Sequence, residues 1–405
     1  MPWLLISYFS HLTMLTLDQL LRAPCVDTGL RFAVSPDGKR VVFSWNKTGV
    51  WELWEIRILE IRELEIRKLE IGLEGAKFSP RFSPDGMYLA FAVDFDGSES
   101  YHIGLYDLEK NTIVDLTPQS GYAQQPNFDF SPDGKRLAIL SDEQGQFALY
   151  ILEIETGGKE LLLDLHRPIW DVQWSPDGRF IAAEVEAQAS DRMIVVCEVE
   201  SETLRRGSGQ AWKVLALDGA TLNAQHPAWL PDSKSLAFSC QNGEWHNIGI
   251  YNVDSDEITW LTDSVGDDTQ PVWARSGEVI GWVHSEGART NFQFKERGGA
   301  IREVKVGEGV HSHPQIASDG VILVYEDVNH PPDLWKINLE TGEAAQLTQS
   351  LEESLGFVQT EEIWYAGVDG VRVPALAVSR KKHAGGIEHS RRARTGIIRS
   401  AGSRS

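Results

Sequence analysis

The chain has 405 residues, of which 42% are hydrophobic, enough for one large core or for two domains. Its net charge is −21, and residues 379–405 hold eight Lys or Arg against one acid. Subtracting that +7 leaves −28 on residues 1–378. An acidic body repels phosphate backbones, so nucleic acid is excluded as a partner of this part of the chain. No apolar run approaches the roughly 20 residues that cross a bilayer, and we expect no membrane partner.

The first segment, residues 1–27, is predicted to be a helical lead-in. Its apolar stripe lies at Leu12, Leu15, Leu17, Leu20 and Leu21. Pro24 ends the predicted helix, since proline cannot continue it.

A four-residue motif then recurs along the chain and organises it. Ser-Pro-Asp-Gly begins at Ser35, Ser83, Ser131 and Ser175. Each copy suits a type I turn, with proline at the second corner and glycine at the fourth. Weaker copies begin at Leu230, Ala274 and Ala317.

The spacing of these turns predicts the fold class. Successive turns are separated by 48, 48, 44, 55, 44 and 43 residues, and one four-stranded propeller blade takes roughly 40 to 50 residues. Residues 28–357 are therefore predicted to form an all-β, seven-bladed β-propeller with four-stranded blades, built from TolB-like or WD-like repeats. The third blade shows the full unit, with strands expected at 127–130, 136–141, 148–153 and 160–163.

Two segments interrupt the regular pattern. Residues 52–71 repeat Leu-Glu-Ile-Arg every five residues, a period that fits neither strand nor helix. We interpret this stretch as a small tandem duplication that lengthens an outer strand or bulges from its edge. Residues 200–213 fall in the longest spacing and are predicted to be an exposed loop.

The end of the chain differs from the repeats. Residues 358–378 are predicted to form a strand pair turning at Asp369 and Gly370. Residues 379–405 are basic, rich in glycine and serine, and without apolar periodicity, which predicts a disordered tail.

Four stretches resemble the prolyl oligopeptidase family of serine peptidases, especially its acylaminoacyl-peptidase-like branch. They are Leu17–Leu21, the Ser-Pro-Asp-Gly series, Pro332–Thr348, and Glu361–Leu376. In that family the last stretch leaves the propeller and enters a C-terminal α/β-hydrolase domain. The resemblance implies that residues 358–378 lead toward such a domain.

The chain departs from the family in its catalytic machinery. The resemblance would place a serine nucleophile in a Gly-x-Ser-x-Gly elbow, and the sequence contains no such motif. Only 27 residues follow Val378, far fewer than a hydrolase domain needs. We therefore expect the chain to carry the propeller without the catalytic domain and to be inactive by itself. A frameshift is one explanation for the basic tail, and sequencing the locus would test it.

No residue is assigned a catalytic, cofactor-binding or metal-binding role, and no cofactor is expected. His311 and His313 are two apart and could be metal ligands, but His313 occupies a recurrent position before proline, shared with Gln125, His226 and Gln270. The repeat explains the presence of His313 better than metal binding does. The acidic residues Asp267, Asp268, Glu326 and Asp327 are interpreted as solvated loop faces, and Trp174, Trp229 and Trp273 as packing on inner strands.

Two functional interpretations remain open. The first is a truncated serine peptidase of the prolyl oligopeptidase family, in which the resemblance implies that the propeller limits entry to short peptides. The alternative is a stand-alone TolB-like propeller that binds a protein or peptide. Expected partners are short peptides, a hydrolase domain or a partner protein. Cys25, Cys197 and Cys240 are too few for a disulfide framework and fit a cytoplasmic protein.

Overall fold

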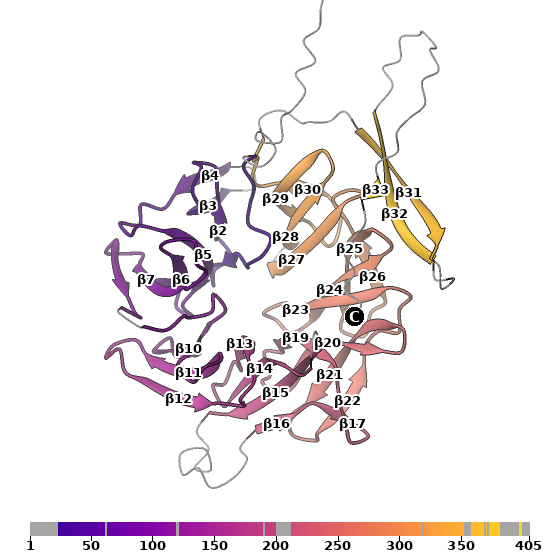
Figure 1. The fold of residues 1–405 in the computed structure, drawn as a ribbon. Coiled ribbons are helices and arrows are strands. Elements are labelled where there is room, and N and C mark those ends of the chain that lie inside the picture. The colour runs from indigo at the N-terminus through magenta and orange to yellow at the C-terminus, as the bar shows by residue number, and fades with distance from the viewer. Residues whose placement is uncertain are drawn as a thin grey trace, which may run out of the picture.

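The computed structural model describes residues 23–398, apart from 61–62, 119–120, 189–190, 200–211, 318–319, 352–357, 368–369, 371 and 381–396. The predicted lead-in helix falls mostly on residues 1–22, outside this range. Seven four-stranded antiparallel sheets are arranged in a ring (Figure 1). The predicted seven-bladed propeller is confirmed.

The first four blades take the chain to residue 214. Blade 1 has β1 (Ala33–Val34), β2 (Arg40–Trp45), β3 (Glu52–Glu60) and β4 (Glu63–Lys68). Blade 2 has β5 (Ala76–Phe82), β6 (Tyr88–Asp94), β7 (His102–Asp107) and β8 (Thr112–Asp115). Blade 3 has β9 (Asp129–Phe130), β10 (Arg136–Ser141), β11 (Ala148–Glu153) and β12 (Lys159–Leu163). Blade 4 has β13 (Ile169–Trp174), β14 (Phe180–Glu186), β15 (Arg192–Glu198) and β16 (Trp212–Val214).

The last three blades follow a small extra hairpin, β17 (Ala216–Leu217) and β18 (Ala220–Thr221). Blade 5 has β19 (Ala224–Trp229), β20 (Ser235–Asn242), β21 (Trp245–Asn252) and β22 (Glu257–Trp260). Blade 6 has β23 (Asp267–Trp273), β24 (Val279–Glu286), β25 (Arg289–Glu296) and β26 (Ile301–Val304). Blade 7 has β27 (Val310–Ala317), β28 (Gly320–Asp327), β29 (His330–Ile337) and β30 (Ala344–Gln346).

Three local predictions can be compared with these strands. The third blade matches, except that β9 begins two residues later and β12 one residue earlier than predicted. The tandem repeat lies in β3 and in the outer strand β4, whose pairing is irregular between Ile58 and Glu60. The loop predicted at 200–213 ends earlier than expected, because Trp212 begins β16, and residues 200–211 lie outside the described residues.

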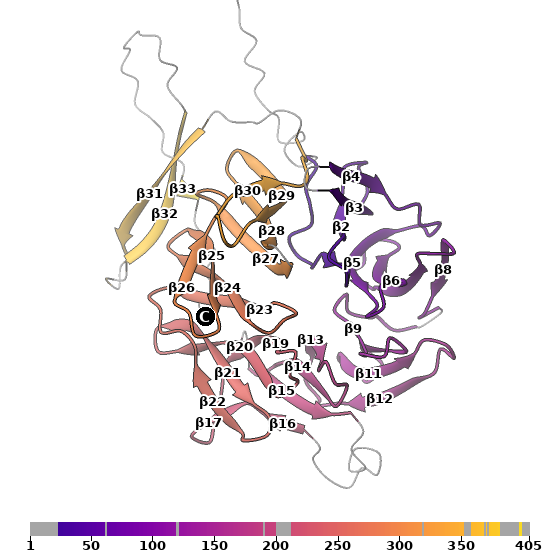
Figure 2. The same ribbon diagram turned by 180° about the vertical axis from the view of Figure 1, so that it is seen from behind.

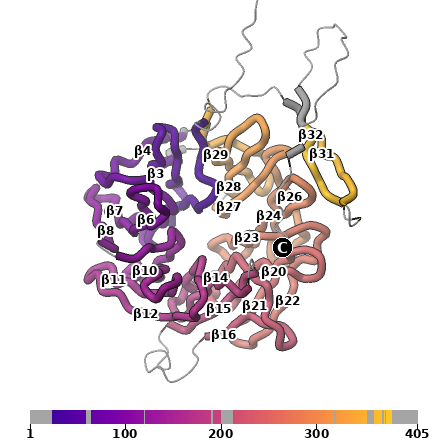
Figure 3. Tube along the Cα trace, in the orientation of Figure 1, coloured from indigo at the N-terminus to yellow at the C-terminus, as the bar shows by residue number. Residues whose placement is uncertain are grey.

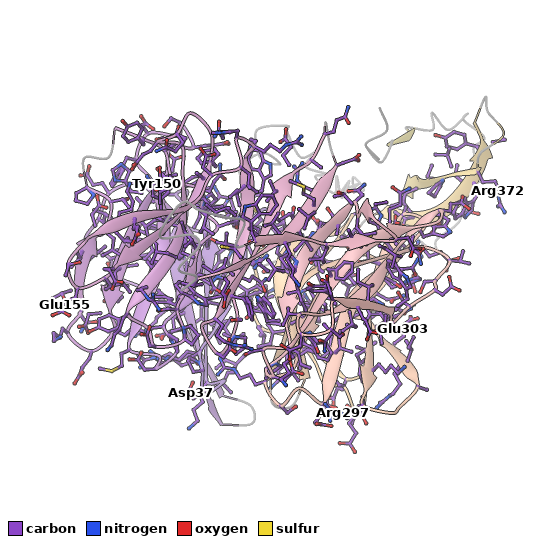
Figure 4. The ribbon with its side chains drawn as sticks, turned by 90° about the horizontal axis from the view of Figure 1, so that it is seen from below. Asp37, Tyr150, Glu155, Arg297, Glu303 and Arg372 are labelled. Atoms are coloured by element: carbon purple, nitrogen blue, oxygen red, sulfur yellow. The ribbon has the colours of Figure 1, made fainter. Side chains whose placement is uncertain are left out.

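The repeated turns join the first and second strands of the blades. In blade 3 the N–H of Gly134 donates to the Ser131 carbonyl (2.8 Å), and Ser131 Oγ accepts the N–H of Arg136 (2.9 Å). Gly134 has a φ of 70°, which glycine adopts without strain. A β-carbon there would lie 3.5 Å from Pro84 Cδ of blade 2, so neighbouring turns pack together. Figure 4 shows Asp37, from the turn of blade 1, at one edge of the disc.

Each blade buries both faces of its sheet against its neighbours. Leu137, Ala138, Ile139 and Leu140 are consecutive in β10, and all four are fully buried. Alternate side chains of one strand therefore enter two different cores. This explains why the middle strands are continuous apolar runs rather than alternating ones.

The ring closes between blades 7 and 1 without exchange of a strand among the described residues. Each blade is one continuous segment, so closure depends on side chains and short backbone contacts. Trp45 Nε1 donates to Ser350 Oγ (2.9 Å), and the N–H of Val26 donates to the Pro332 carbonyl (3.0 Å). Phe43 and Val324 lie in the shared core.

A further sheet follows the propeller. β31 (Val358–Ala366) pairs antiparallel with β32 (Arg372–Arg380), where the sequence predicted a strand pair. β33 (Ile397–Ile398) pairs with Leu376 and Ala377 of β32. This short strand differs from the disorder predicted for 379–405; it and the end of β32 are the only described parts of that stretch. The hairpin stands beside β25 and β26 in both views (Figures 1 and 2).

Close approach of a glycine to a phenylalanine recurs in the middle strands and gives a stability prediction. A β-carbon on Gly104 would lie 2.7 Å from Phe91 Cζ, whereas one on Gly72 would meet nothing within 4 Å. We expect Gly104→Ala to lower the free energy of unfolding by about 1–3 kcal/mol through overpacking. Urea denaturation measures this, with Gly72→Ala as the matched control. Equal stability of the two variants would contradict the packing described.

Candidate binding channel

The first strands of the blades surround the propeller axis (Figure 3). A cavity of about 480 Å³ lies among them. Its lining comes from six of the seven blades and from the segment before β1, and it is largely polar. This axial channel is the candidate functional site.

A repeat position that the sequence analysis missed builds the channel. The residue four places before each turn is polar in every blade. We call these residues the axial ring: Arg31, Ser79, Asn127, Asp171, His226, Gln270 and His313. All of them except Ser79 line the cavity. Aligning the seven turns would have revealed the ring. The sequence analysis recognised only His226, Gln270 and His313, and it wrongly grouped Gln125 with them, since Gln125 lies six places before its turn and Asn127 is the ring member of blade 3.

The backbone at this position bulges in four blades. Ser79, His226, Gln270 and His313 have φ between 51° and 56°, and each is followed by proline. The pairing between first and second strands shifts register there. A non-glycine residue in this conformation is strained and needs compensating contacts.

Side chains of the preceding blade supply two of these contacts. Glu184 Oε2 accepts the N–H of His226 (2.9 Å), and Gln270 Oε1 accepts the N–H of His313 (2.7 Å). Gln315 Oε1 similarly accepts the N–H of Val34 across the closure of the ring (3.2 Å). The axial contacts therefore join one blade to the next.

The channel also contains charged groups. Arg31 of blade 1 forms an ion pair with Asp171 of blade 4, so this pair reaches across the axis. Arg81 of blade 2 lines the same space.

Burial raises the pKa of Asp129 and of Glu184. Burial, with the charge of Arg31 nearby, lowers the pKa of His226 to about 3 and that of His313 to about 4. Both rings are consequently neutral at pH 7.

The two histidines considered as metal ligands face different surroundings. His311 Nε2 accepts the N–H of Val306 (2.9 Å), and its ring packs on Tyr325. His313 lines the channel. Within the described residues, no group of three or more His, Cys, Asp or Glu is placed to hold a metal ion. The interpretation of His313 as a repeat position agrees with this placement.

The predicted tryptophans lie on first strands, as expected. The indoles of Trp229 and Trp273 donate to the carbonyls of Gln173 (3.1 Å) and Ala228 (3.2 Å) in the preceding blades. Trp174 Nε1 donates to the carbonyl of Gly178 in its own blade (3.1 Å). They are packing residues.

One acidic residue lies elsewhere than the sequence predicts. Asp268 was predicted on a solvated loop, but it lies in β23 and is fully buried. Its carboxylate contacts His284 Nδ1 (2.7 Å) and accepts from Ser264 Oγ (2.7 Å). These partners compensate for its lost hydration. Asp267, Glu326 and Asp327 are only partly buried, although they too belong to strands.

One end of the propeller is richer in exposed apolar side chains than the other. Successive strands of a blade run in opposite directions. The loops between second and third strands therefore lie at the same end of the propeller as the connections from one blade to the next. At this end, which we call the apolar end, lie Val50, Phe95, Tyr122, Leu217, Val265, Val310 and Val328. The opposite end, which carries the turns, has Met87 and Ile301.

The β31–β32 hairpin contacts the apolar end. Glu362 Oε2 lies 4.0 Å from Arg289 Nε, beside the loop between β24 and β25. A β-carbon on Gly287 in that loop would meet the carboxylate of Glu362, which would have to move aside. Trp364 and Tyr365 of β31 are exposed. In Figure 4, Arg372 of β32 lies toward the edge opposite Asp37.

Comparison with known proteins agrees with this architecture. The family profile "TolB beta propeller domain" matches residues 34–211. The propeller of this chain is therefore similar to TolB-like β-propellers. It is 25% identical over 204 residues to the "Uncharacterized peptidase YuxL" of Bacillus subtilis, covering 50% of this chain and 28% of that protein. It is 21% identical over 369 residues to "Dipeptidyl-peptidase 5" of Porphyromonas gingivalis, covering 84% and 51%.

Solved peptidase structures share the fold. A puromycin-hydrolyzing peptidase of Mycobacterium tuberculosis superposes with a TM-score of 0.68 at 15% identity, over 89% of this chain and 58% of that one. The acylaminoacyl peptidase of Pyrococcus horikoshii gives a TM-score of 0.60 at 13% identity, over 89% and 58%. This TolB-like propeller therefore spans little more than half of these peptidases and resembles their propeller region.

The histidines of the axial ring give a pH prediction. Because their pKa values are lowered on folding, the unfolded chain binds more protons between about pH 4 and 6.5, and stability falls as pH drops through that window. Asp129 and Glu184, with raised pKa values, oppose this trend. Glutamine is the replacement of choice, because Gln270 occupies the same repeat position in blade 6. The double variant His226→Gln/His313→Gln should therefore lose less Tm between pH 7.5 and 4.5 than the unmodified chain.

Thermal denaturation at the two pH values tests this expectation. His330→Gln serves as the matched control, because His330 is exposed at the apolar end. It should lose as much Tm on acidification as the unmodified chain. Parallel losses in all three proteins would show that the axial histidines are not neutral in the folded state.

Proposed function

We propose that this propeller is the substrate-gating part of a serine peptidase of the prolyl oligopeptidase family. The observation that carries the proposal is the β31–β32 hairpin, which leaves blade 7 and packs at the apolar end. A propeller acting alone has no need of this element. The similarity to peptidases, which this chain covers only in part, supports the same conclusion.

The apolar end supplies the docking surface in this proposal. Its exposed apolar side chains would be covered by an α/β-hydrolase domain that continues the direction of the hairpin. The axial channel opens among the first strands beneath that domain, and the propeller would limit access to short peptides. An α/β-hydrolase domain is thus the expected partner of the propeller.

A second function is kept because the family profile itself is that of TolB propellers. In this alternative the chain binds a protein or peptide without belonging to a peptidase. Both alternatives are compatible with a cytoplasmic location, which we propose from the three free cysteines. Among the described residues, the structure has no long apolar helix of the kind that spans a bilayer.

A fusion experiment tests the gating role. A hydrolase domain of the prolyl oligopeptidase family is joined after residue 378, and a matched fusion lacks residues 23–357. We expect both fusions to cleave a short chromogenic peptide, and the fusion with the propeller to cleave casein at least tenfold more slowly. Equal casein cleavage by the two fusions would contradict gating and favour the stand-alone alternative.

The chain by itself should be inactive. It has no Gly-x-Ser-x-Gly elbow, and loss of a triad member alone costs several orders of magnitude in rate. We expect no turnover of acyl-amino-acid or proline-containing chromogenic peptides and no labelling by a fluorophosphonate. A serine that labels stoichiometrically, and no longer does so after mutation to alanine, would refute this expectation.

A further inference from the structure

Two guanidinium groups line the axial channel, and they differ in their partners. Arg31 forms its ion pair with Asp171. The Arg81 side chain is half-buried, and its guanidinium makes no hydrogen bond or ion pair with the described residues. A guanidinium has five N–H donors, and removing an unpaired charge from water is costly. Arg81 is therefore a charged group held in a cavity without a protein partner.

The surroundings of Arg81 add to the free-energy cost of keeping its unpaired charge in the channel. The loss of hydration in the channel and the like charge of Arg31 both lower the pKa of Arg81. An arginine nevertheless keeps its proton in a protein. Asp129 and Asp171 attract it through space but do not contact it. An anion placed between Arg31 and Arg81 would relieve their repulsion and use their free donors.

The charges of the channel select the kind of anion. Asp171 and Glu184 line the channel with the two arginines, and Asp129 lies near enough to attract both. A phosphate dianion would meet repulsion from these groups. A single carboxylate carries less charge, is planar, and can accept two parallel N–H bonds from one guanidinium.

The channel wall formed by blades 5 to 7 suits the part of the ligand that follows its carboxylate. The side-chain oxygen of Gln270 accepts the backbone N–H of His313, and its amide N–H₂ group has no hydrogen-bond partner among the described residues. The rings of His226 and His313 add neutral polar groups on the same side. Neutral donors and acceptors of this kind fit peptide groups, and 480 Å³ is within the usual size of small-ligand sites.

We propose that the axial channel binds the terminal carboxylate of a short peptide, with Arg81 as the anchor and Arg31 as the second donor. The choice of a peptide rests on the proposed function. The recognition of a carboxylate rests only on the contacts of the channel. The site would hold a peptide end at the propeller axis.

Isothermal titration calorimetry on the 405-residue chain tests the site. The probes are N-acetyl-alanyl-alanine, its C-terminal amide, N-acetylalanine and inorganic phosphate. We expect the free dipeptide acid to bind and the amide to bind at least tenfold more weakly. Equal binding of acid and amide, or phosphate binding as tight as the acid, would refute the carboxylate assignment, as would no binding of either acid at millimolar concentration.

Variants locate the binding in the channel. Arg81→Gln should weaken binding of the acid at least tenfold, and Arg81→Lys should weaken it less, because it keeps the charge without the paired donors. The control Arg297→Gln, at an exposed loop between β25 and β26, should bind as the unmodified chain does. Unchanged affinity in Arg81→Gln would place the binding elsewhere and overturn the proposal.

Two further outcomes distinguish a ligand site from a structural role. Arg81→Gln should keep its Tm, because it removes a charge that has no protein partner; a large loss of Tm would show that Arg81 is structural and would count against the site. Binding of N-acetylalanine without binding of the dipeptide would support the carboxylate site while contradicting its peptide ligand. Failure of the fusion experiment, in contrast, would leave the calorimetric result intact.

Discussion

Burial of both faces of every blade is the constraint on which this structure depends. A four-stranded sheet of this composition cannot stay exposed on either face, and its neighbours in the ring cover both. The ring must therefore close, and it does so between blades 7 and 1 through packing and a few hydrogen bonds rather than a shared strand. Within blade 2, Gly104 of β7 is the cross-strand partner of Phe91 of β6, and its lack of a side chain leaves room for the Phe91 ring in the core.

Closure of the ring has a chemical consequence at its axis. The same repeat position lies in or just before the first strand of each blade, so six of the seven side chains, distant in sequence, line one cavity. Apolar side chains there would make a sealed core, but the axial ring is polar in all seven blades. The hydrogen bonds from Glu184 and Gln270 to the bulged backbone of the next blade account for part of this polarity. They do not account for Arg81, which lines the channel beside the ring.

The sequence was informative about the fold because the fold is a repeat. The spacing of the turns was enough to predict the blade count, and proline and glycine marked the turns, since their backbone requirements are local. The channel was harder to predict, because the pairing of Arg31 with Asp171 joins blades 1 and 4 across the axis. Asp268 was misjudged for a related reason. A carboxylate can be buried wherever a partner such as His284 lies opposite, and the partner is on another strand.

The two ends of the propeller divide its roles. Neighbouring turns pack on each other at one end, where Gly134 lies beside Pro84 of the preceding blade, and the long segment between β15 and β16 belongs to that end too. The apolar end has most of the exposed apolar side chains at the two ends and the hairpin that follows blade 7. In the function proposed above, this is the end that an α/β-hydrolase domain would cover, because the hairpin that follows blade 7 packs there. The axial channel would then connect the covered end with the interior of the ring, and its two arginines would face any peptide held between them.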